Sequence, residues 1–409
     1  MMDVAILAIG DEVVSGKTIN TNAAYLAKAL FKHNYFVVTH LACPDRIPDI
    51  MNALSFLYRS VDLVIPIGGI GPTADDVTKE AVSRYFQEDL VLYPDILEAI
   101  TAYFARRGQV MPPNNRKQAY FPQNAVIIPN ENGTAPGMIY EKMGKTIIVL
   151  PGPERELIPM VETTVLPYLG KKQTGFYLKR EFRFMNIGES RLMESLQPII
   201  DCFPSLKMVS YVKESGIDFI VSTNNRDEAS LLEEASEQIQ RELAAYWVGD
   251  GSQEIQELVV QRLIEKGDTV AVSESLTGGL LASMIVDVPG SSAVFHEAVV
   301  TYSNEAKVKR LGVSEESLMQ YGAVSEEVAR EMALGILREA KATFGLSTTG
   351  IAGPTGATPN KPVGLVYIGI ATKDRVNVYR YIFNGNRNVV RKKTCYTALF
   401  HLWKDFLEE

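Results

Sequence analysis

Histidine, cysteine and tryptophan are scarce in this chain, with 4, 3 and 2 residues among 409. The three thiols, Cys43, Cys202 and Cys395, are far apart and form no Cys-x-x-Cys pair. This pattern favours neither a disulfide framework nor a structural zinc site. An excess of basic residues is also missing, because the net charge is −8. The composition therefore argues against a nucleic-acid partner.

Long apolar runs are missing as well. No stretch approaches the roughly 18 consecutive apolar residues of a membrane span. The first apolar run is short, and no basic segment precedes it as in a signal peptide. We therefore expect a cytoplasmic protein without a membrane partner. A length of 409 residues predicts two or three domains.

Short apolar runs alternate with helical patterns in the first part of the chain. Strands are predicted at 4–10, 61–69 and 146–153. A helix follows each of them, and Asn20 or Asn22 is able to cap the first. The alternation predicts a parallel sheet covered on both faces. Ligands bind such sheets beyond the carboxyl ends of the strands, where the Gly-rich turns of this chain would lie.

The pattern changes further along. Residues 171–250 alternate as strands and helices of a small α+β module, which ends in the linker Gly-Asp-Gly-Ser-Gln. Beyond it, a long helix is predicted with Ser325 as its N-cap and Gly345 just after its end. The sequence thus predicts an α/β protein with domains at 1–170, 171–250 and 251–409.

The stretch Ile-Gly-Gly-Ile-Gly-Pro-Thr-Ala-Asp-Asp begins at residue 67 and follows an apolar strand. Glycines let backbone N–H groups converge on an anion, and the next helix N-terminus favours negative charge. Asp75 and Asp76 would repel a bare phosphate, but a divalent cation resolves the conflict by bridging carboxylates and phosphate oxygens. The alternative is a tight turn whose aspartates cap the helix, and spacing alone leaves both interpretations open.

Four segments resemble, in order, the N-terminal domain of the CinA family. They are IGDEVVSGKTINTN (9–22), the stretch 67–80, NGTAPGM (132–138) and PGPERELIPM (151–160). That domain is similar to the molybdopterin-binding fold of the MogA and MoaB proteins. The resemblance implies an ADP-ribose pyrophosphatase that uses a divalent metal (Mg, Mn or Co), often with K⁺.

The resemblance also implies roles for individual residues. Asp75 and Asp76 would hold the metal or the pyrophosphate, and Glu12 and Asn22 would face the same cleft. The residues implied around the phosphates are Gly68, Gly69, Gly71, Thr73 and Lys79. One position departs from the family, which usually has Asp where this chain has Asn20.

A second stretch, Ser-Glu-Ser-Leu-Thr-Gly-Gly (273–279), has the form of a strand-to-helix turn with Ser275 at its tip. A hydroxyl nucleophile needs a base. His296 is the only local histidine, and we expect it to be half-buried and structural. A desolvated lysine is another base, and Lys307 with Tyr302 would form a hydrogen-bonded chain to Ser275. Spacing alone leaves a purely structural role open for these residues.

Seven segments follow the order of the CinA C-terminal domain. They are SESLTGG, GSS (290–292), TYSNEAK (301–307), GAVSEEV (322–328), TGIAGPTG (349–356), KPVGLVYIG (361–369) and GNRNVVR (385–391). The bacterial deamidase PncC is similar. The resemblance implies hydrolysis of nicotinamide mononucleotide to nicotinate mononucleotide and ammonia. It makes Ser275 the nucleophile, with Tyr302 and Lys307 as its activating partners.

Further residues of this domain take implied substrate-binding roles. Those at the oxyanion or phosphate turn are Thr277, Gly278 and Gly279, and those lining the nucleotide pocket are Thr349, Gly350 and Gly353. Arg387 is the candidate for the substrate phosphate, because a guanidinium fork matches phosphate geometry. Family members usually have Cys where this chain has Leu276. No metal ligands occur at suitable spacing here, so we expect this site to need no ion.

Together these features predict a bifunctional enzyme of pyridine-nucleotide salvage. Its partners would be nicotinamide mononucleotide and ADP-ribose, and we expect a homodimer. The alternative is a nucleotide- or pterin-binding N-terminal module without turnover, in a protein associated with competence or DNA damage.

Overall fold

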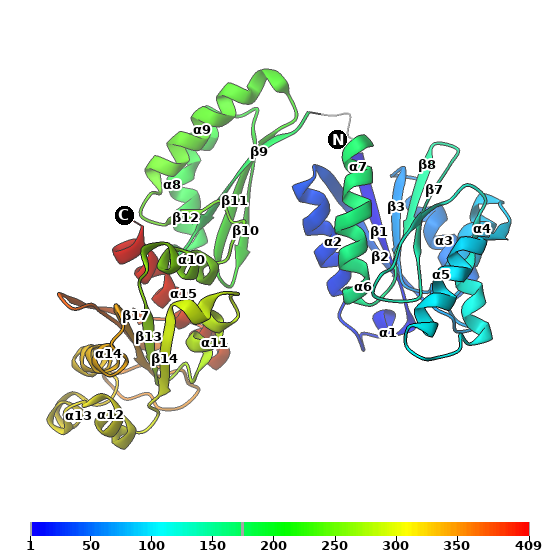
Figure 1. Ribbon diagram of the computed structural model, residues 1–409. Helices are drawn as coiled ribbons and strands as arrows, with labels where there is room; N and C mark the ends of the chain where they lie inside the picture. The colour runs from blue at the N-terminus through cyan, green and yellow to red at the C-terminus, as the bar shows by residue number, and fades with distance from the viewer. Residues whose placement is uncertain (1, 173–175, 409) are drawn as a thin grey trace. The chain divides into compact units, whose positions relative to one another are not determined.

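The computed structural model describes residues 2–172 and 176–408. The chain forms two compact units, which divide between Tyr177 and Leu178 (Figure 1). Each unit is built from mixed sheets covered by helices, so the predicted α/β fold class is confirmed. None of the described helices combines the length and the apolar character needed to cross a membrane.

The first unit contains a six-stranded sheet. In order across the sheet, its strands are β2 (Tyr35–Cys43), β1 (Met2–Ile9), β3 (Leu63–Ile67), β8 (Lys145–Val149), β7 (Gly137–Lys142) and β6 (Val126–Ile128). The first four strands are parallel, as predicted, but β7 and β6 pair antiparallel. Met143 and Gly144 connect β7 to β8 with φ angles of 55° and 75°. A two-residue turn of this kind permits only antiparallel strands.

Helices cover both faces of this sheet (Figure 1). On one face lie α2 (Thr21–Lys32), α6 (Glu154–Met160) and α7 (Leu166–Lys172), and on the other α3 (Ile47–Leu57), α4 (Thr78–Phe86) and α5 (Pro94–Ala105). Three short elements complete the unit: α1 (Asp11–Val14), the strand pair β4 (Leu90–Leu92) and β5 (Tyr120–Pro122), and a 3-10 segment at Pro113–Ala119. Asn20 caps α2 by accepting a hydrogen bond from the Ala23 N–H at 3.1 Å.

The second unit contains two sheets. The first is antiparallel, in the order β10 (Lys207–Lys213), β11 (Gly216–Thr223), β9 (Leu178–Phe184) and β12 (Trp247–Gly249). It is covered on one face by α8 (Glu189–Cys202) and α9 (Ala229–Glu242) (Figure 1). The other sheet has the order β14 (Phe295–Val300), β13 (Val270–Glu274), β15 (Phe344–Gly350), β16 (Leu365–Ala371) and β17 (Val376–Ile382).

The five-stranded sheet is also covered on both faces. On one face pack α12 (Asn304–Leu311), α13 (Glu315–Tyr321) and α14 (Glu326–Ala340), and on the other α10 (Ile255–Lys266), α11 (Leu280–Val286) and α15 (Arg387–Leu402). Strands β14, β13 and β15 are parallel, so the turns after β13 and β14 emerge at the same edge of the sheet. The chain divides into two compact units, and everything from Leu178 onwards belongs to the second. The further division of this unit near residue 250 stays a prediction.

The predicted N-cap of the long helix is confirmed, but its predicted end is wrong. Ser325 accepts a hydrogen bond from the Val328 N–H, as an N-cap should. The helix stops at Ala340, and Lys341 rather than Gly345 takes the left-handed conformation, with φ 50°. Gly345 lies in β15, where a Cβ atom would come within 2.4 Å of the Ala333 carbonyl oxygen. The glycine serves the close packing of α14 on the sheet.

A buried ion pair within the four-stranded sheet of the second unit also reaches the start of α10. Arg183 on β9 is 2% exposed and donates from Nε and Nη2 to Asp218 at 2.6 and 3.1 Å. Its Nη1 lies 3.0 Å from Glu254, the residue that caps α10. The arginine therefore connects the four-stranded sheet to the N-terminus of α10.

We predict that Arg183→Ala lowers the free energy of unfolding of the second unit by about 3 kcal/mol, because Asp218 loses its buried partner and keeps only the half-exposed Lys213. Trp247 and Trp403 are the two tryptophans of the chain and both belong to this unit, so tryptophan fluorescence during urea unfolding reports on it. Arg180→Ala on the same strand removes an exposed pair with Glu233 and should cost about 0–1 kcal/mol. Equal effects of the two substitutions would contradict the assigned role.

Candidate functional site

A cavity of about 620 Å³ opens in the first unit beyond the carboxyl ends of β1 and β3. The turns after β1, β3 and β8 all contribute to its lining, which confirms the predicted edge of the sheet. Residues from these turns that line it include Glu12, Asn22, Gly68, Gly69, Gly71, Asp75, Asp76, Pro151 and Gly152. The structure thus brings together most of the residues that the first resemblance implies.

Two glycines shape the floor of this cavity. Gly68 and Gly69 have φ angles of +101° and +66°, which favour glycine. A Cβ atom on Gly68 would lie 2.4 Å from the Ile9 carbonyl oxygen, and one on Gly69 would lie 2.2 Å from Thr78 Oγ1. The N–H groups of residues 69–71 have no hydrogen-bonding partner within the described ranges. They are available to an anion, as the sequence predicted.

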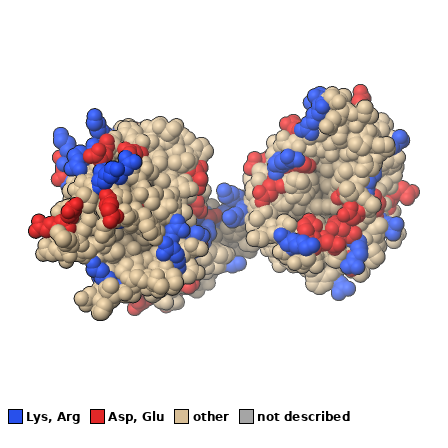
Figure 2. Space-filling view, turned by 90° about the horizontal axis from the view of Figure 1, so that it is seen from below, with Lys and Arg blue, Asp and Glu red and all other residues tan. Residues whose placement is uncertain are grey.

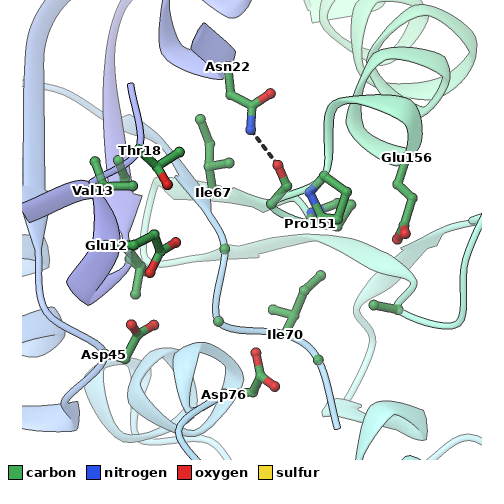
Figure 3. Close-up of a pocket in the computed structure, with 18 of the residues that line it drawn as sticks. Glu12, Val13, Thr18, Asn22, Asp45, Ile67, Ile70, Asp76, Pro151 and Glu156 are labelled. Carbon is green, nitrogen blue, oxygen red and sulfur yellow. Dashed lines mark hydrogen bonds between the residues drawn. The ribbon is translucent and has the colours of Figure 1, made fainter. Parts of the chain in front are cut away.

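The lining of the cavity is strongly acidic. It holds six carboxylates and neither Lys nor Arg; the acids are Glu12, Asp45, Asp75, Asp76, Glu154 and Glu156. Acidic side chains gather on the face of the first unit seen in Figure 2 (the right-hand body). Glu12, Asp45 and Asp76 lie on one side of the cavity, and Glu156 lies on the other (Figure 3).

Asp45 was not predicted from the sequence, although it follows β2 at the same edge of the sheet. Its carboxylate accepts a hydrogen bond from the Asp11 N–H at 2.9 Å. Burial raises the pKa of Asp45, and the charges of Glu12, Asp11 and Asp75 raise it further. No basic side chain lines the cavity, but behind it the hydrogen bond from Thr73 and the charge of Lys117 lower the pKa of Asp75.

Asp76 is held in place by Thr73. The Thr73 N–H and hydroxyl both donate to Asp76 Oδ2, at 2.8 and 2.5 Å. A Cβ atom on Gly71 would lie 2.5 Å from the same oxygen, so a larger residue there would displace the Asp76 carboxylate. Thr73 itself does not line the cavity, which differs from the predicted phosphate contact. Instead it orients the Asp76 carboxylate.

Lys79 also departs from its predicted role beside the phosphates. Its side chain is buried, and Nζ donates to the Lys117 and Gln118 carbonyl oxygens at 3.3 and 2.8 Å. It also lies over the Phe121 ring, 4.2 Å from the centroid. Burial lowers the pKa of Lys79 to about 7. Lys79 therefore anchors the 3-10 segment and contributes nothing to the cavity lining, which contradicts the predicted phosphate contact.

The carboxylates do not form a complete metal cage. Within residues 2–172 and 176–408, no group of three or more His, Cys, Asp and Glu side chains is arranged to hold an ion by itself. Mg²⁺ typically takes one or two carboxylates and completes its shell with water and substrate phosphate. The donor set of Asp45, Asp75, Asp76 and Glu12 fits that mode of binding, in which substrate and cation enter together.

Asn22 and Glu156 complete the cavity from the side of β8. Asn22 Nδ2 donates to the Gly152 carbonyl oxygen at 2.5 Å (Figure 3), while its buried Oδ1 has no partner in the described structure. Glu156 accepts from Asn130 Nδ2 at 2.7 Å. A Cβ atom on Gly133 would lie 2.3 Å from Glu156, so this carboxylate packs against the loop that bears Thr134. Sequence reasoning did not find Glu156.

A second cluster lies at the edge of the five-stranded sheet. Ser275 follows β13 and Lys307 lies on α12, and Lys307 Nζ donates to Ser275 Oγ at 3.3 Å. Lys307 Nζ also donates to the carbonyl oxygens of Thr301 and Tyr302, at 2.7 and 3.4 Å. The predicted contact between the serine and the lysine is present in the structure.

The environment of Lys307 disfavours its positive charge. The residue is 1% exposed, and no ion pair to it occurs among the described residues. Burial lowers the pKa of Lys307 to about 8. A substantial fraction of this amine is neutral near pH 8 and can accept a proton.

The Tyr302 hydroxyl does not join the predicted hydrogen-bonded chain with Lys307 and Ser275. Its side chain is 63% exposed, and its hydroxyl accepts from Arg387 Nη2 at 3.2 Å. Only the backbone carbonyl of Tyr302 contacts Lys307. Arg387 also donates to the Gly353 carbonyl oxygen at 3.0 Å, so it links two of the predicted substrate-binding segments.

The turn that bears Ser275 is held by two residues that sequence reasoning missed. Glu274 is fully buried and accepts hydrogen bonds from the N–H groups of Gly279, Leu281 and Ala282 at 2.8–3.1 Å. The sequence predicted that the Gly279 N–H would face an oxyanion or a phosphate. It is not available for this role, because it donates to Glu274. Arg391 donates to the Thr277 carbonyl oxygen at 2.6 and 3.2 Å.

The remaining predicted residues have structural partners. Thr277 and Thr349 are fully buried; their hydroxyls pair with Thr348 at 2.7 Å and with the Ala323 carbonyl oxygen at 2.7 Å. Gly350 has no room for a side chain, because a Cβ atom would lie 2.7 Å from the Leu365 carbonyl oxygen. Gly278 has φ +59° and is exposed.

Leu276 and His296 make no side-chain contact with Ser275 or Lys307 through a hydrogen bond in the described structure. Leu276 packs in the hydrophobic core, so its difference from the family's cysteine does not alter the polar groups around Ser275. His296 is exposed rather than half-buried, and its only contact in the described part of the chain is a 3.4 Å approach to the Ala340 carbonyl oxygen.

Known proteins match both units. Residues 5–171 match a family model described as a probable molybdopterin binding domain, and residues 252–406 match the CinA C-terminal domain. A putative competence-damage inducible protein of Alkaliphilus metalliredigens is 42% identical over 410 residues, which covers 100% of both chains. A protein with the same description from Caldicellulosiruptor saccharolyticus is 43% identical over 98% of both chains. A crystal structure of the protein CinA with unknown function from Thermoplasma acidophilum is 32% identical; it covers 40% of this chain and 96% of its own, with a TM-score of 0.38.

Proposed function

The chain belongs to the CinA family, and on that premise we propose that it is a bifunctional hydrolase of pyridine nucleotides. The second unit would hydrolyse nicotinamide mononucleotide to nicotinate mononucleotide and ammonia. The first unit would cleave ADP-ribose to AMP and ribose 5-phosphate. The observation that supports the proposal best is the contact of the Lys307 amine with the Ser275 hydroxyl, in surroundings that give the amine no counter-charge.

Deamidation would proceed through a covalent ester. Ser275 Oγ bonds to the amide carbonyl carbon while the neutral Lys307 amine takes the hydroxyl proton. Lys307 then gives this proton to the departing nitrogen, the C–N bond breaks, and ammonia leaves. Water attacks the ester and passes a proton through Lys307 back to Ser275, which frees the carboxylate product.

Other residues would position the substrate and the turn. Arg387 is exposed beside Tyr302 and Gly353 and offers a guanidinium group to the substrate phosphate. Glu274 and Arg391 fix the backbone that follows Ser275, so the hydroxyl meets the amine in a constant geometry.

We predict that Ser275→Ala and Lys307→Met each reduce ammonia release from nicotinamide mononucleotide by at least about a thousandfold, because one removes the nucleophile and the other its base. Cleavage of ADP-ribose by the same proteins should be unchanged. Ammonia and AMP are measured in parallel on the purified full chain.

Matched controls are available on neighbouring helices. Ser283 on α11 and Lys309 on α12 are exposed, and Ser283→Ala and Lys309→Met should leave both activities intact. Ammonia release that survives Ser275→Ala in a folded protein would remove the serine from the mechanism. Loss of both activities in one variant would contradict the assignment of two separate sites.

The first unit would bind the pyrophosphate in its acidic cavity. The N–H groups of residues 69–71 would donate to phosphate oxygens at its glycine-rich floor. One or two of the carboxylates of Asp45, Asp75, Asp76 and Glu12 would hold a divalent cation, which supplies positive charge to the pyrophosphate when it is bound. Six carboxylates and no basic side chain make binding of a dianionic substrate without a cation strongly unfavourable.

We predict that removing divalent cations with a chelator abolishes both AMP formation and detectable binding of ADP-ribose, measured by titration calorimetry. Ammonia release from nicotinamide mononucleotide should continue, because no carboxylate pairs with Lys307 in the described structure. Asp76→Asn should lower AMP formation by at least about a hundredfold, since it removes a ligand charge.

Asp95→Asn on α5 changes an equally charged but exposed residue outside the cavity and serves as the control. AMP formation that persists after cation removal contradicts the assigned role of the carboxylates. Metal-dependent binding of ADP-ribose without AMP formation would instead establish the alternative, a binding module without turnover.

A further inference from the structure

Gln118 is an unexpected member of the acidic cavity. It lies in the 3-10 segment Pro113–Ala119, far along the chain from the glycine-rich turns, yet it lines the same cavity. Its side chain is 1% exposed, and its Nε2 has no hydrogen-bonding partner within the described residues. Buried side-chain amides are almost always hydrogen-bonded, so this free donor requires an explanation.

The Gln118 amide contacts one neighbouring side chain. Asn115 is 4% exposed, and its Nδ2 donates to Gln118 Oε1 at 2.8 Å. Because Oε1 accepts this bond, the other half of the amide is the NH₂ group. A donor with almost no exposure is not satisfied by bulk water, and because Gln118 lines the cavity, a molecule bound there can supply the acceptor.

The position of Gln118 indicates which part of a ligand would supply the acceptor. Lys117, its neighbour, donates from Nζ to the carbonyl oxygens of Thr73 and Asp76 at 2.9 and 2.6 Å. Asn114 donates to the Pro72 carbonyl oxygen at 3.3 Å, and Lys79 holds Gln118 itself by its carbonyl oxygen. The segment is thus fastened to the loop that carries the metal-binding aspartates, where a phosphate would lie.

We infer that Gln118 is a substrate-binding residue of the first unit, whose NH₂ group donates a hydrogen bond to a phosphoryl oxygen of the bound nucleotide. This inference rests on the proposed function of the cavity. The ammonium groups of Lys79 and Lys117 donate to backbone carbonyl oxygens, and no basic side chain lines the cavity. A neutral amide is therefore the side-chain donor that this part of the site offers to a phosphate.

Two substitutions test the donor. Gln118→Glu keeps an oxygen that accepts from Asn115 but replaces the NH₂ group, and Gln118→Met removes the donor without adding charge. In titrations of the full chain with ADP-ribose and Mg²⁺, both should raise Kd by about tenfold or more, as expected for a hydrogen bond to a charged acceptor. Gln123→Glu makes the same change at an exposed position nearby and should leave Kd unchanged.

Each outcome decides the inference. Unchanged Kd in both Gln118 variants means that a bound water satisfies the amide, and weakening by Gln118→Glu alone reflects charge; either result overturns the inference. Thermal unfolding of the same variants, followed by circular dichroism, verifies that the first unit is folded, because ammonia release reports only on the second unit. If the parent protein binds ADP-ribose but forms no AMP, the proposed turnover fails while the Kd ratio still tests Gln118. If it binds neither ADP-ribose nor AMP, both proposals fail.

Discussion

The amine of Lys307 lies inside the protein, where no described residue forms an ion pair with it, and the proposed chemistry of the second unit depends on this arrangement. A buried ammonium without a counter-charge is costly, so burial lowers the pKa of the group to about 8. Three oxygens, from Ser275, Thr301 and Tyr302, receive its hydrogens. The fold therefore places a base beside a serine without any histidine.

The first unit shows the opposite electrostatic arrangement. Its cavity has six acidic side chains and no basic ones, and the pKa of Asp45 is raised by burial and by neighbouring acids. One site has an amine without an acid, and the other has acids without an amine. Under the proposed function, Lys307 and Ser275 transfer a proton with their own groups, whereas the acidic cavity of the first unit takes a phosphate together with a cation. The two activities should therefore differ in their need for metal.

Sequence patterns predicted those parts of the sites that depend on the backbone. Gly-rich turns between apolar strands and helices have few conformations open to them, and the turns after adjacent parallel strands emerge together, which brings Ser275 to Lys307. Side-chain direction was less predictable. Spacing on α4 does not show that Lys79 points into the protein rather than into the cavity. Glu274 and Gln118 were missed because their roles depend on partners that only the tertiary structure supplies.

The pH dependence of kcat/KM for deamidation of nicotinamide mononucleotide tests the central claim most directly. Only the neutral amine of Lys307 can take the proton of Ser275, and protonation below its pKa removes the base. The account predicts that kcat/KM rises about tenfold per pH unit below about 8 and levels off above it. A profile that is flat across this range, or that falls through it, would show that Lys307 is not the base.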